Sequence, residues 1–248
     1  MPGTGRQFAI IAGSGFRSFG TDASSETVTT VYGEPSGPIR ELRYAGQSVY
    51  LLPRHGDHLS IPPHAINYRA NMQALRQLKV SCVIAMNTVG SIRRDMHPGE
   101  IAVPHQLIDY TWGRAHSLYD GSAGLEHIDF TAPFAEHLRQ ALLQSARTAG
   151  VAVHDGGVYA VMQGPRLETA AEVDRIERDG ADYVGMTAMP EAALARELGM
   201  DYACLSLIVN YAAGRGEKPI HDDLEAGTMT AKMQAMKILR VFFGATEE

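Results

Sequence analysis

The chain has 248 residues, of which 45% are hydrophobic and 20% are charged, so it has the composition of an ordinary globular protein with a large apolar core. Its formal net charge is −6 and it has no cluster of lysines and arginines, which argues against a nucleic-acid backbone as the main partner. A small anion can still be bound locally. Strand-like and helix-like patterns alternate without a linker, which favours one α/β domain over residues 1–248.

Three further features narrow the class of protein. No apolar run reaches about 18 residues, and the first apolar stretch is too short for a signal peptide, so we expect neither a membrane span nor secretion. Cys82 and Cys204 lie inside apolar runs and are expected to be buried, reduced thiols, which fits the cytoplasm. His55, His58 and His64 have no cysteine or carboxylate partner at ligand spacing, so no metal site is expected.

Two early strands end in residues suited to an anion. Residues 8–12 form an apolar run that stops at a glycine loop around Ser14, where backbone N–H groups can turn toward a ligand. Residues 40–52 read as a hairpin, and Arg54 and His55 follow its second strand. An arginine and a histidine emerging together can offer a fork of donors to a phosphate. On its own the glycine loop is better explained as an ordinary turn after a first strand, and the alternative for Arg54 and His55 is a surface loop with incidental charge.

The next two elements are a helix and a central strand. Residues 65–79 keep helical spacing of apolar positions, which belong to the core. Residues 80–86 are almost continuously apolar, as in a strand covered on both faces, and we expect this strand to end at Asn87 and Thr88. Open α/β sheets usually bind ligands at the carboxyl ends of their strands.

A long polar and aromatic segment follows. Residues 109–130 are too many for a simple connection, so the segment is interpreted as a lid or an oligomer contact, and it contains His127. Residues 133–149 form the clearest helix of the chain and carry no evident chemistry.

Residues 162–172, MQGPRLETAAE, lie between an apolar strand and an amphipathic helix. Gly164 and the proline after it give the loop one path out of the strand. Thr169 and Glu172 have the spacing of a capping box, which would start the helix and hold Glu168 just before its first turn. By spacing alone, a solvated loop acid is the favoured interpretation of Glu168, and a carboxylate facing a pocket is the alternative.

Further polar residues follow strands in the last third of the chain. A short strand over 182–186 leads to Thr187 at a helix N-terminus, which favours an anion. A buried strand over 202–209 delivers Asn210 at its end, where an amide needs hydrogen-bond partners. His221 stands at the entrance to the C-terminal helix.

Several of these motifs together resemble a known family. GPRLETAAE is similar to the GPxFETxAE signature of trimeric purine nucleoside phosphorylases and their methylthioadenosine phosphorylase relatives, and the branch acting on S-methyl-5′-thioinosine is the most similar. The resemblance covers nearly the whole chain. It implies a single-domain twisted mixed β-sheet with helices on both faces, a homotrimer, and no cofactor beyond phosphate as a co-substrate. The motifs that carry it are the Gly13-Ser14-Gly15 loop, Arg54-His55-Gly56, Asn87-Thr88-Val89-Gly90-Ser91, GPRLETAAE, GMTAMPEA and Val209-Asn210-Tyr211.

The resemblance also implies roles for particular residues. Asn210, Glu168 and His55 would be the catalytic residues. Phosphate would be bound by a set taken from several strand ends: Ser14, Arg54, His55, Asn87 or Thr88, and Thr187. The nucleoside would be bound by Met186, Glu168, Asn210, Tyr211, Ala212 and His221, with His127 reaching the site of a neighbouring subunit.

The base preference follows from hydrogen-bond chemistry. A 6-oxopurine presents acceptors at O6 and N7 and a donor at N1, whereas adenine presents a 6-amino donor and an N1 acceptor. Glu168 suits the N1–H donor and the Asn210 amide suits O6 or N7. Methylthioadenosine phosphorylases have serine at the Glu168 position and aspartates at Asn210 and Ala212. The expected reaction is therefore phosphorolysis of S-methyl-5′-thioinosine to hypoxanthine and 5-methylthioribose 1-phosphate.

Other functions stay open at this point. A general inosine/guanosine phosphorylase is favoured by His221, because a histidine at the start of this helix contacts the 5′-hydroxyl in such enzymes. Methylthioadenosine phosphorylase is a further alternative. A nucleoside-binding protein without turnover, or a nucleosidase that uses water, would leave Arg54 and Thr187 without an anion.

Overall fold

The computed structural model describes residues 5–13, 21–44, 46–58, 60–122, 124 and 126–244. The strands are β1 (Phe8–Ala12), β2 (Thr21–Glu26), β3 (Ile39–Tyr44), β4 (Gln47–Pro53), β5 (Cys82–Ser91), β6 (Ile101–Val103), β7 (Gln106–Asp109), β8 (Val153–Asp155), β9 (Val158–Val161), β10 (Tyr183–Gly185) and β11 (Asp201–Tyr211). The helices are the short 3-10 turn Pro63–Ala65, α1 (Tyr68–Gln77), α2 (Glu136–Thr148), α3 (Ala170–Arg178), α4 (Ala188–Glu197) and α5 (Ile220–Phe242).

All the strands belong to one mixed 11-stranded sheet that branches at β5. The first half of β5 lies parallel to β1 on one side and to β11 on the other. At its carboxyl end, where β1 has stopped, β5 pairs antiparallel with β10, which leads on to β9 and β7. The ends of β5, β10 and β11 therefore meet in one place.

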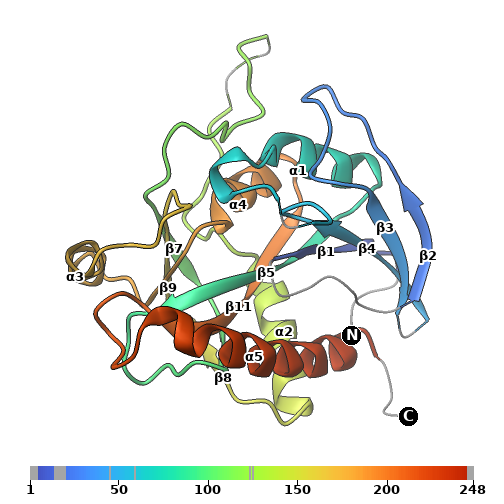
Figure 1. Cartoon of the computed structure of the whole chain (residues 1–248). Helices are drawn as coiled ribbons and strands as arrows, with labels where there is room; N and C mark the ends of the chain where they lie inside the picture. The colour runs from blue at the N-terminus through green and yellow to red at the C-terminus, as the bar shows by residue number, and fades with distance from the viewer. Residues whose placement is uncertain are drawn as a thin grey trace.

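Helices cover both faces of the sheet (Figure 1). On one face, α1 and α4 pack over side chains such as Ile11 and Val83. On the other face, α2 and α5 pack over Ile10 and Ile84. Successive residues of β1 and β5 thus pack into the two different cores, one on each face of the sheet, as the alternation of side chains along a strand requires. The predicted fold class is confirmed.

Local sequence signals placed several elements correctly. The hairpin over 40–52 is confirmed as antiparallel β3 and β4. The capping box is confirmed: Thr169 accepts from the backbone N–H of Glu172, whose carboxylate accepts from the backbone N–H of Thr169. Cys82 and Cys204 are buried and free. No helix or strand occurs in the described part of 110–135, and no helix among the described residues is long and apolar enough to span a membrane.

Several predicted boundaries are wrong. Helices α1 and α2 each begin three residues later than expected, at Tyr68 and Glu136. The central strand does not end before Asn87, because β11 provides backbone partners for β5 as far as Ser91. β11 likewise continues through Asn210 to Tyr211, after a register shift between Ile208 and Asn210. Helix α5 begins at Ile220, so His221 lies inside its first turn. The short strand β8 was not predicted at all.

Candidate active site

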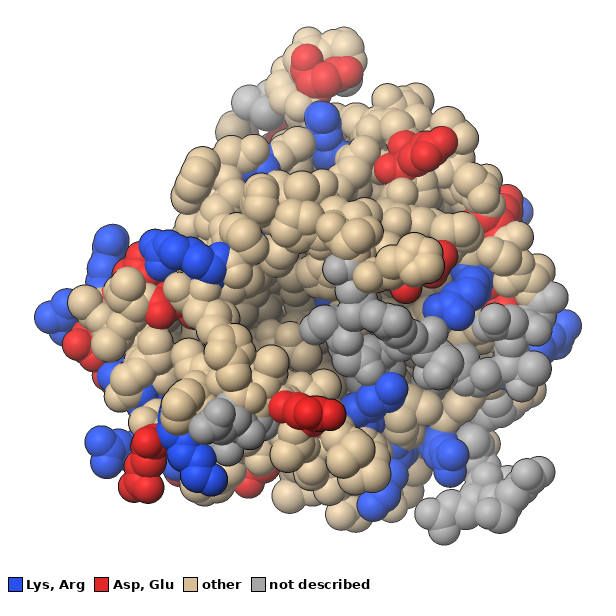
Figure 2. Space-filling model, viewed as in Figure 1, with Lys and Arg blue, Asp and Glu red and all other residues tan. Residues whose placement is uncertain are grey.

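A cavity of about 390 Å³ lies where the carboxyl ends of the strands meet. The face drawn in Figure 2 is hollowed near its centre and is ringed there mainly by uncharged side chains. The cavity is lined by residues from eight places along the chain: 13 after β1, 54 and 55 after β4, 61–63, 88–90 of β5, 165, 167 and 168 after β9, 184–187 at and after the end of β10, 209, 210, 212 and 213 at and after the end of β11, and Ile220 and Leu224 of α5. Segments far apart in the sequence thus form one site.

Arg54 lies at the cavity, but its charge is already paired. Its side chain is fully buried, with Nε and Nη2 donating to the two oxygens of Glu191 at 2.5 and 2.9 Å and Nη1 donating to the carbonyl of Met86 at 2.8 Å. The Tyr202 hydroxyl also donates to Glu191, at 2.8 Å. The expected open fork is therefore occupied by a carboxylate, and only the N–H groups left over are available to a ligand. No sequence motif indicated this role of Glu191.

Thr187 lies at the cavity and is held by Asn87. The Asn87 amide Nδ2 donates to Thr187 Oγ1 at 2.7 Å, and Asn87 is only 1% exposed. Because Asn87 does not line the cavity, it orients a neighbour, whereas Thr88, the next residue of β5, faces the cavity. Thr187 is the N-cap of α4 as predicted, but Met189 has non-helical dihedral angles, so the regular helix begins only after it.

His55 is held as a neutral imidazole. Its Nδ1 lies 2.8 Å from the carbonyl of Ile61, which fixes Nδ1 as the donor and leaves Nε2 as an acceptor. Burial, with the Arg54 charge adding to it, lowers the pKa of His55. A neutral imidazole at the cavity can accept a proton or a hydrogen bond from a hydrogen phosphate.

Glu168 is partly buried and lines the same cavity, in the loop after β9. Burial, with the Glu172 charge adding to it, raises the pKa of Glu168. The loop is fixed on both sides: Gly164 has φ +63° and passes so close to Met186 that a Cβ would lie 2.5 Å from its sulfur. Arg166 pairs with Glu172 at 2.7 Å. Glu168 is therefore not a freely solvated acid.

Asn210 projects from β11 into the same cavity. Its Nδ2 donates to the carbonyl of Tyr211 at 2.6 Å, which leaves the second N–H of the amide for a ligand. A Cβ at Gly90 would lie 3.0 Å from this Nδ2, so the glycine of β5 makes room for the amide. Met186 and Ala212 also line the cavity.

Some expected site residues lie elsewhere. Ser14 falls outside the described residues. Tyr211 points away from the cavity, with its hydroxyl 2.5 Å from Nδ1 of His97, because adjacent strand residues face opposite sides. His127 is exposed on this chain.

His221 is also exposed and does not line the cavity. Ile220 and Leu224 line it instead, since residues four apart share a helix face.

An apolar group of cavity residues was not predicted from the sequence. These are Ile61, Pro62, Pro63, Leu167, Ile220 and Leu224. The apolar pair four residues apart at the start of α5 was a usable signal, since such spacing marks one helix face. Pro62 and Pro63 gave no such sequence signal, because their position beside the cavity depends on the path of the whole loop.

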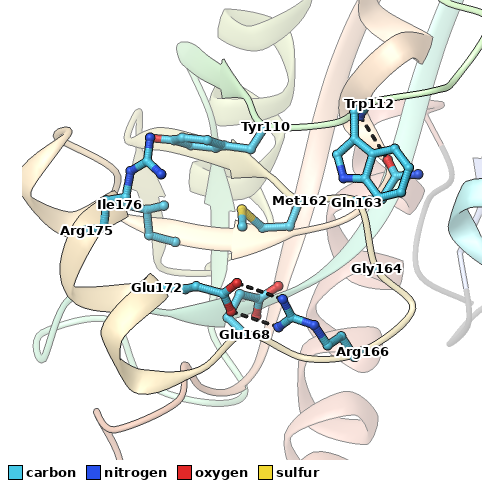
Figure 3. A pocket seen from close by; sticks show the side chains of 10 residues that line it. All are labelled: Tyr110, Trp112, Met162, Gln163, Gly164, Arg166, Glu168, Glu172, Arg175 and Ile176. Atoms are coloured by element: carbon cyan, nitrogen blue, oxygen red, sulfur yellow. Dashed lines mark hydrogen bonds and ion pairs between the residues drawn. The ribbon is translucent and has the colours of Figure 1, made fainter.

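A second, smaller cavity of about 290 Å³ adjoins the first and shares Glu168 with it. Figure 3 shows Glu168 beside the Arg166–Glu172 pair, with Trp112 across the opening. Trp112 is 72% exposed. Among the described residues, no group of three or more His, Cys, Asp or Glu side chains is arranged to hold a metal ion.

Comparison with known proteins identifies the family. The model of the Phosphorylase superfamily matches residues 7–243, and the chain belongs to this superfamily. It is 51% identical over 213 residues, 84% of this chain and 86% of the relative, to a probable S-methyl-5′-thioinosine phosphorylase of Xylella fastidiosa. It is 42% identical over 226 residues, 88% and 84% of the two chains, to a 6-oxopurine nucleoside phosphorylase of Pyrococcus furiosus.

A solved structure shares the whole fold. Methylthioadenosine phosphorylase from Schistosoma mansoni in complex with tubercidin matches with a TM-score of 0.89 at 31% identity, covering 98% of this chain and 93% of that one. The expected membership of the nucleoside phosphorylases is confirmed.

Proposed function

We propose that the protein catalyses phosphorolysis of S-methyl-5′-thioinosine, giving hypoxanthine and 5-methylthioribose 1-phosphate. The relatives that share about half of its residues are named for this substrate, and the 6-oxopurine enzymes are the next group. Inorganic phosphate is the co-substrate, and the reaction needs no metal or organic cofactor. The two free cysteines fit a cytoplasmic enzyme.

The observation that carries the choice of substrate is the wall formed by α5. Ile220 and Leu224 line the cavity, and His221, the residue that would select a 5′-hydroxyl, is exposed outside it. An apolar wall leaves a hydroxyl without a hydrogen-bond partner, whereas a methylthio group buries its surface against it. This favours the methylthio nucleoside over inosine.

The base end of the cavity favours a 6-oxopurine. The Glu168 carboxylate accepts the N1–H of hypoxanthine, and the free N–H of Asn210 donates to O6 or N7. Adenine would set its 6-amino donor against the Asn210 donor and its N1 acceptor against the Glu168 carboxylate. A site built on such groups discriminates by about 10⁴-fold or more.

In the reaction, a phosphate oxygen forms a bond to C1′ as the bond from C1′ to N9 breaks. The electron pair goes to the purine, where the Asn210 N–H stabilises it, and the proton of hydrogen phosphate ends on the released hypoxanthine. Thr88, Thr187 and His55 bind the phosphate, with Asn87 orienting Thr187. Because Glu191 balances most of the Arg54 charge, Arg54 orients the phosphate through its remaining N–H groups more than it attracts the phosphate by net charge.

The second candidate is a general inosine/guanosine phosphorylase, which the 6-oxopurine relatives favour. Hypoxanthine release from S-methyl-5′-thioinosine and from inosine, and adenine release from methylthioadenosine, each measured with and without phosphate, separate the candidates. The proposal expects release from S-methyl-5′-thioinosine above all, and only with phosphate. Equal or faster turnover of inosine would establish the general enzyme, and phosphate-independent release would establish a nucleosidase.

The assembly we propose is a homotrimer in which His127 contacts the site of a neighbouring subunit. Its exposure on the isolated chain supports this role, as does the exposed Trp112 beside the second cavity. Exposed aromatic side chains are enriched where chains associate.

A further inference from the structure

Arg114 is a buried cation at the start of the long segment between β7 and α2. It is 7% exposed, and its guanidinium carbon lies 5.4 Å from the centre of the Tyr68 ring. All its hydrogen bonds go to uncharged acceptors: the Tyr68 hydroxyl at 3.2 Å, Gln163 Oε1 at 3.2 Å, and the carbonyls of Met162 at 3.2 Å, Gln163 at 2.8 Å, Met186 at 2.8 Å and Met189 at 2.6 Å.

The other buried arginines of the described chain are paired with acids. Arg54 faces Glu191, and Arg139 faces Glu136 and Asp155. For Arg114, the structure records no carboxylate partner within the described ranges. A buried cation is normally stabilised by a carboxylate. Arg114 is stabilised instead by neutral acceptors, which the planar guanidinium reaches in several directions at once.

The carbonyl acceptors of Arg114 form two groups, and each group belongs to one side of the cavity. The carbonyls of residues 162 and 163 directly precede the loop that carries Glu168. Those of residues 186 and 189 flank Thr187 on the phosphate side. A single planar side chain thus joins the loop at the purine end to the turn at the phosphate end.

We propose that Arg114 is a positioning residue that fixes the distance between the phosphate-binding turn 186–189 and the purine-binding loop 162–168. This role rests on the function proposed above. Arg114 does not line the cavity, so it acts through Thr187 and Glu168. Phosphorolysis needs the attacking oxygen and the leaving purine in line, and a displacement of about 1 Å reduces the rate by about 10²-fold.

Lysine cannot replace arginine in this role. Its ammonium is a point with three donors, whereas the guanidinium spreads five N–H groups over a rigid plane. An Arg114→Lys variant keeps the positive charge and loses the bridge between the two loops, which separates the effect of the bridge from that of the charge.

The experiment compares Arg114→Lys and Arg114→Ala with Arg139→Lys as a matched control. Arg139 is also buried and donates to carbonyls, those of Val103 and Pro104, but it lies away from the cavity. We measure kcat, KM for phosphate and KM for the nucleoside well below the melting temperature. Amide hydrogen exchange is measured in peptides covering 162–168 and 186–189.

For Arg114→Lys we expect kcat to fall by about 10²-fold, KM for phosphate to rise, and both peptides to exchange faster. Millimolar guanidinium ion is expected to restore part of the activity of Arg114→Ala. The Arg139→Lys control is expected to keep its kinetic constants within about twofold.

Kinetic constants of Arg114→Lys within about twofold of the control, with unchanged exchange in both peptides, would overturn the proposal. If Arg114→Ala does not fold, Arg114→Lys alone decides. A wild-type enzyme without phosphate-dependent hypoxanthine release would refute the proposed function instead. The hydrogen-exchange measurement needs no turnover, so it would still test whether Arg114 links residues 162–168 to residues 186–189.

Discussion

At the scale of single residues, the cavity combines groups that are satisfied inside the protein with groups left for a ligand. The Arg54 fork is occupied by Glu191, and the Asn87 amide Nδ2 donates to Thr187. Glu168 and the second N–H of Asn210 keep free hydrogen-bonding capacity at the cavity. This division explains why a residue that matches a binding motif need not touch the ligand itself.

The Asn210 amide is the residue-scale test of base preference. Asn210→Asp is expected to lower kcat/KM for S-methyl-5′-thioinosine by about 10²-fold, because a carboxylate cannot donate to O6 or N7. Turnover of methylthioadenosine is expected to rise relative to it. Parallel steady-state assays measure both, with Asp201→Asn at the other end of β11 as the control exchange. An unchanged ratio of the two substrates would remove Asn210 from base selection.

His55 gives a pH dependence of stability with a definite sign. Its pKa in the folded protein is lowered from an ordinary value near 6.5, so folding favours the neutral ring. The contribution of His55 to stability is complete above that pH and is lost as the pH falls toward the folded-state pKa. The free energy of unfolding, measured in urea between about pH 5 and 8, should fall less steeply toward acid pH in His55→Gln than in wild type.

The control is His64→Gln, a change at an exposed residue, in which the free energy of unfolding should depend on pH as in wild type. The same pH dependence in all three proteins would contradict this role of His55.

At the scale of elements, predictions from sequence succeeded where the signal was local. The capping box of α3 and the β3–β4 hairpin depend on residues a few positions apart. The end of β5 was misplaced because polar residues there still find backbone partners on β11, which is distant in the sequence. Glu191 was missed as the partner of Arg54 because the two are 137 positions apart. The C-terminal helix was expected to start just after His221, whereas α5 begins at Ile220. This small difference puts His221 on the exposed side of the first turn instead of at the cavity.

Gly227 tests how closely α5 must approach β11. A Cβ at this position would lie 2.3 Å from the carbonyl oxygen of Val209, so Gly227→Ala has to move the helix. We expect destabilisation of about 1–3 kcal/mol in thermal or urea unfolding and a raised KM for the nucleoside, because Leu224 moves with the helix. Met229→Ala, an exposed change on the same helix, is the control. If Gly227→Ala is as stable as that control, the close approach is not required.

At the scale of the whole molecule, the class of fold was predictable and the completed site was not. Apolar runs separated by helical patterns indicate an α/β sheet, but they do not reveal that β5 joins two branches of it. That junction is set by long-range pairing, and it brings Thr88, Thr187 and Asn210 to one cavity.

The proposed homotrimer predicts complementation between inactive variants. Glu168→Ala removes the acceptor for the base from its own subunit, and His127→Ala removes the side chain offered to a neighbour. Mixed trimers reassembled from the two contain some sites with both residues intact. Activity above that of either variant alone is expected, together with a trimer mass by light scattering. A monomeric mass, or no gain on mixing, would contradict the shared site.

The cavity is built from separate pieces of the chain. Thr88 and Gly90 are two positions apart on one face of β5, so this one strand contributes both to the end of the cavity proposed to bind phosphate and to the end proposed to bind the purine. The wall near the proposed 5′ group comes from α5, a separate piece of the chain. Mutational drift in the first turns of this helix can therefore change the 5′ substituent that is accepted while the reacting bond keeps its place. Substrate repertoire in such an enzyme can diversify without any re-engineering of its chemistry.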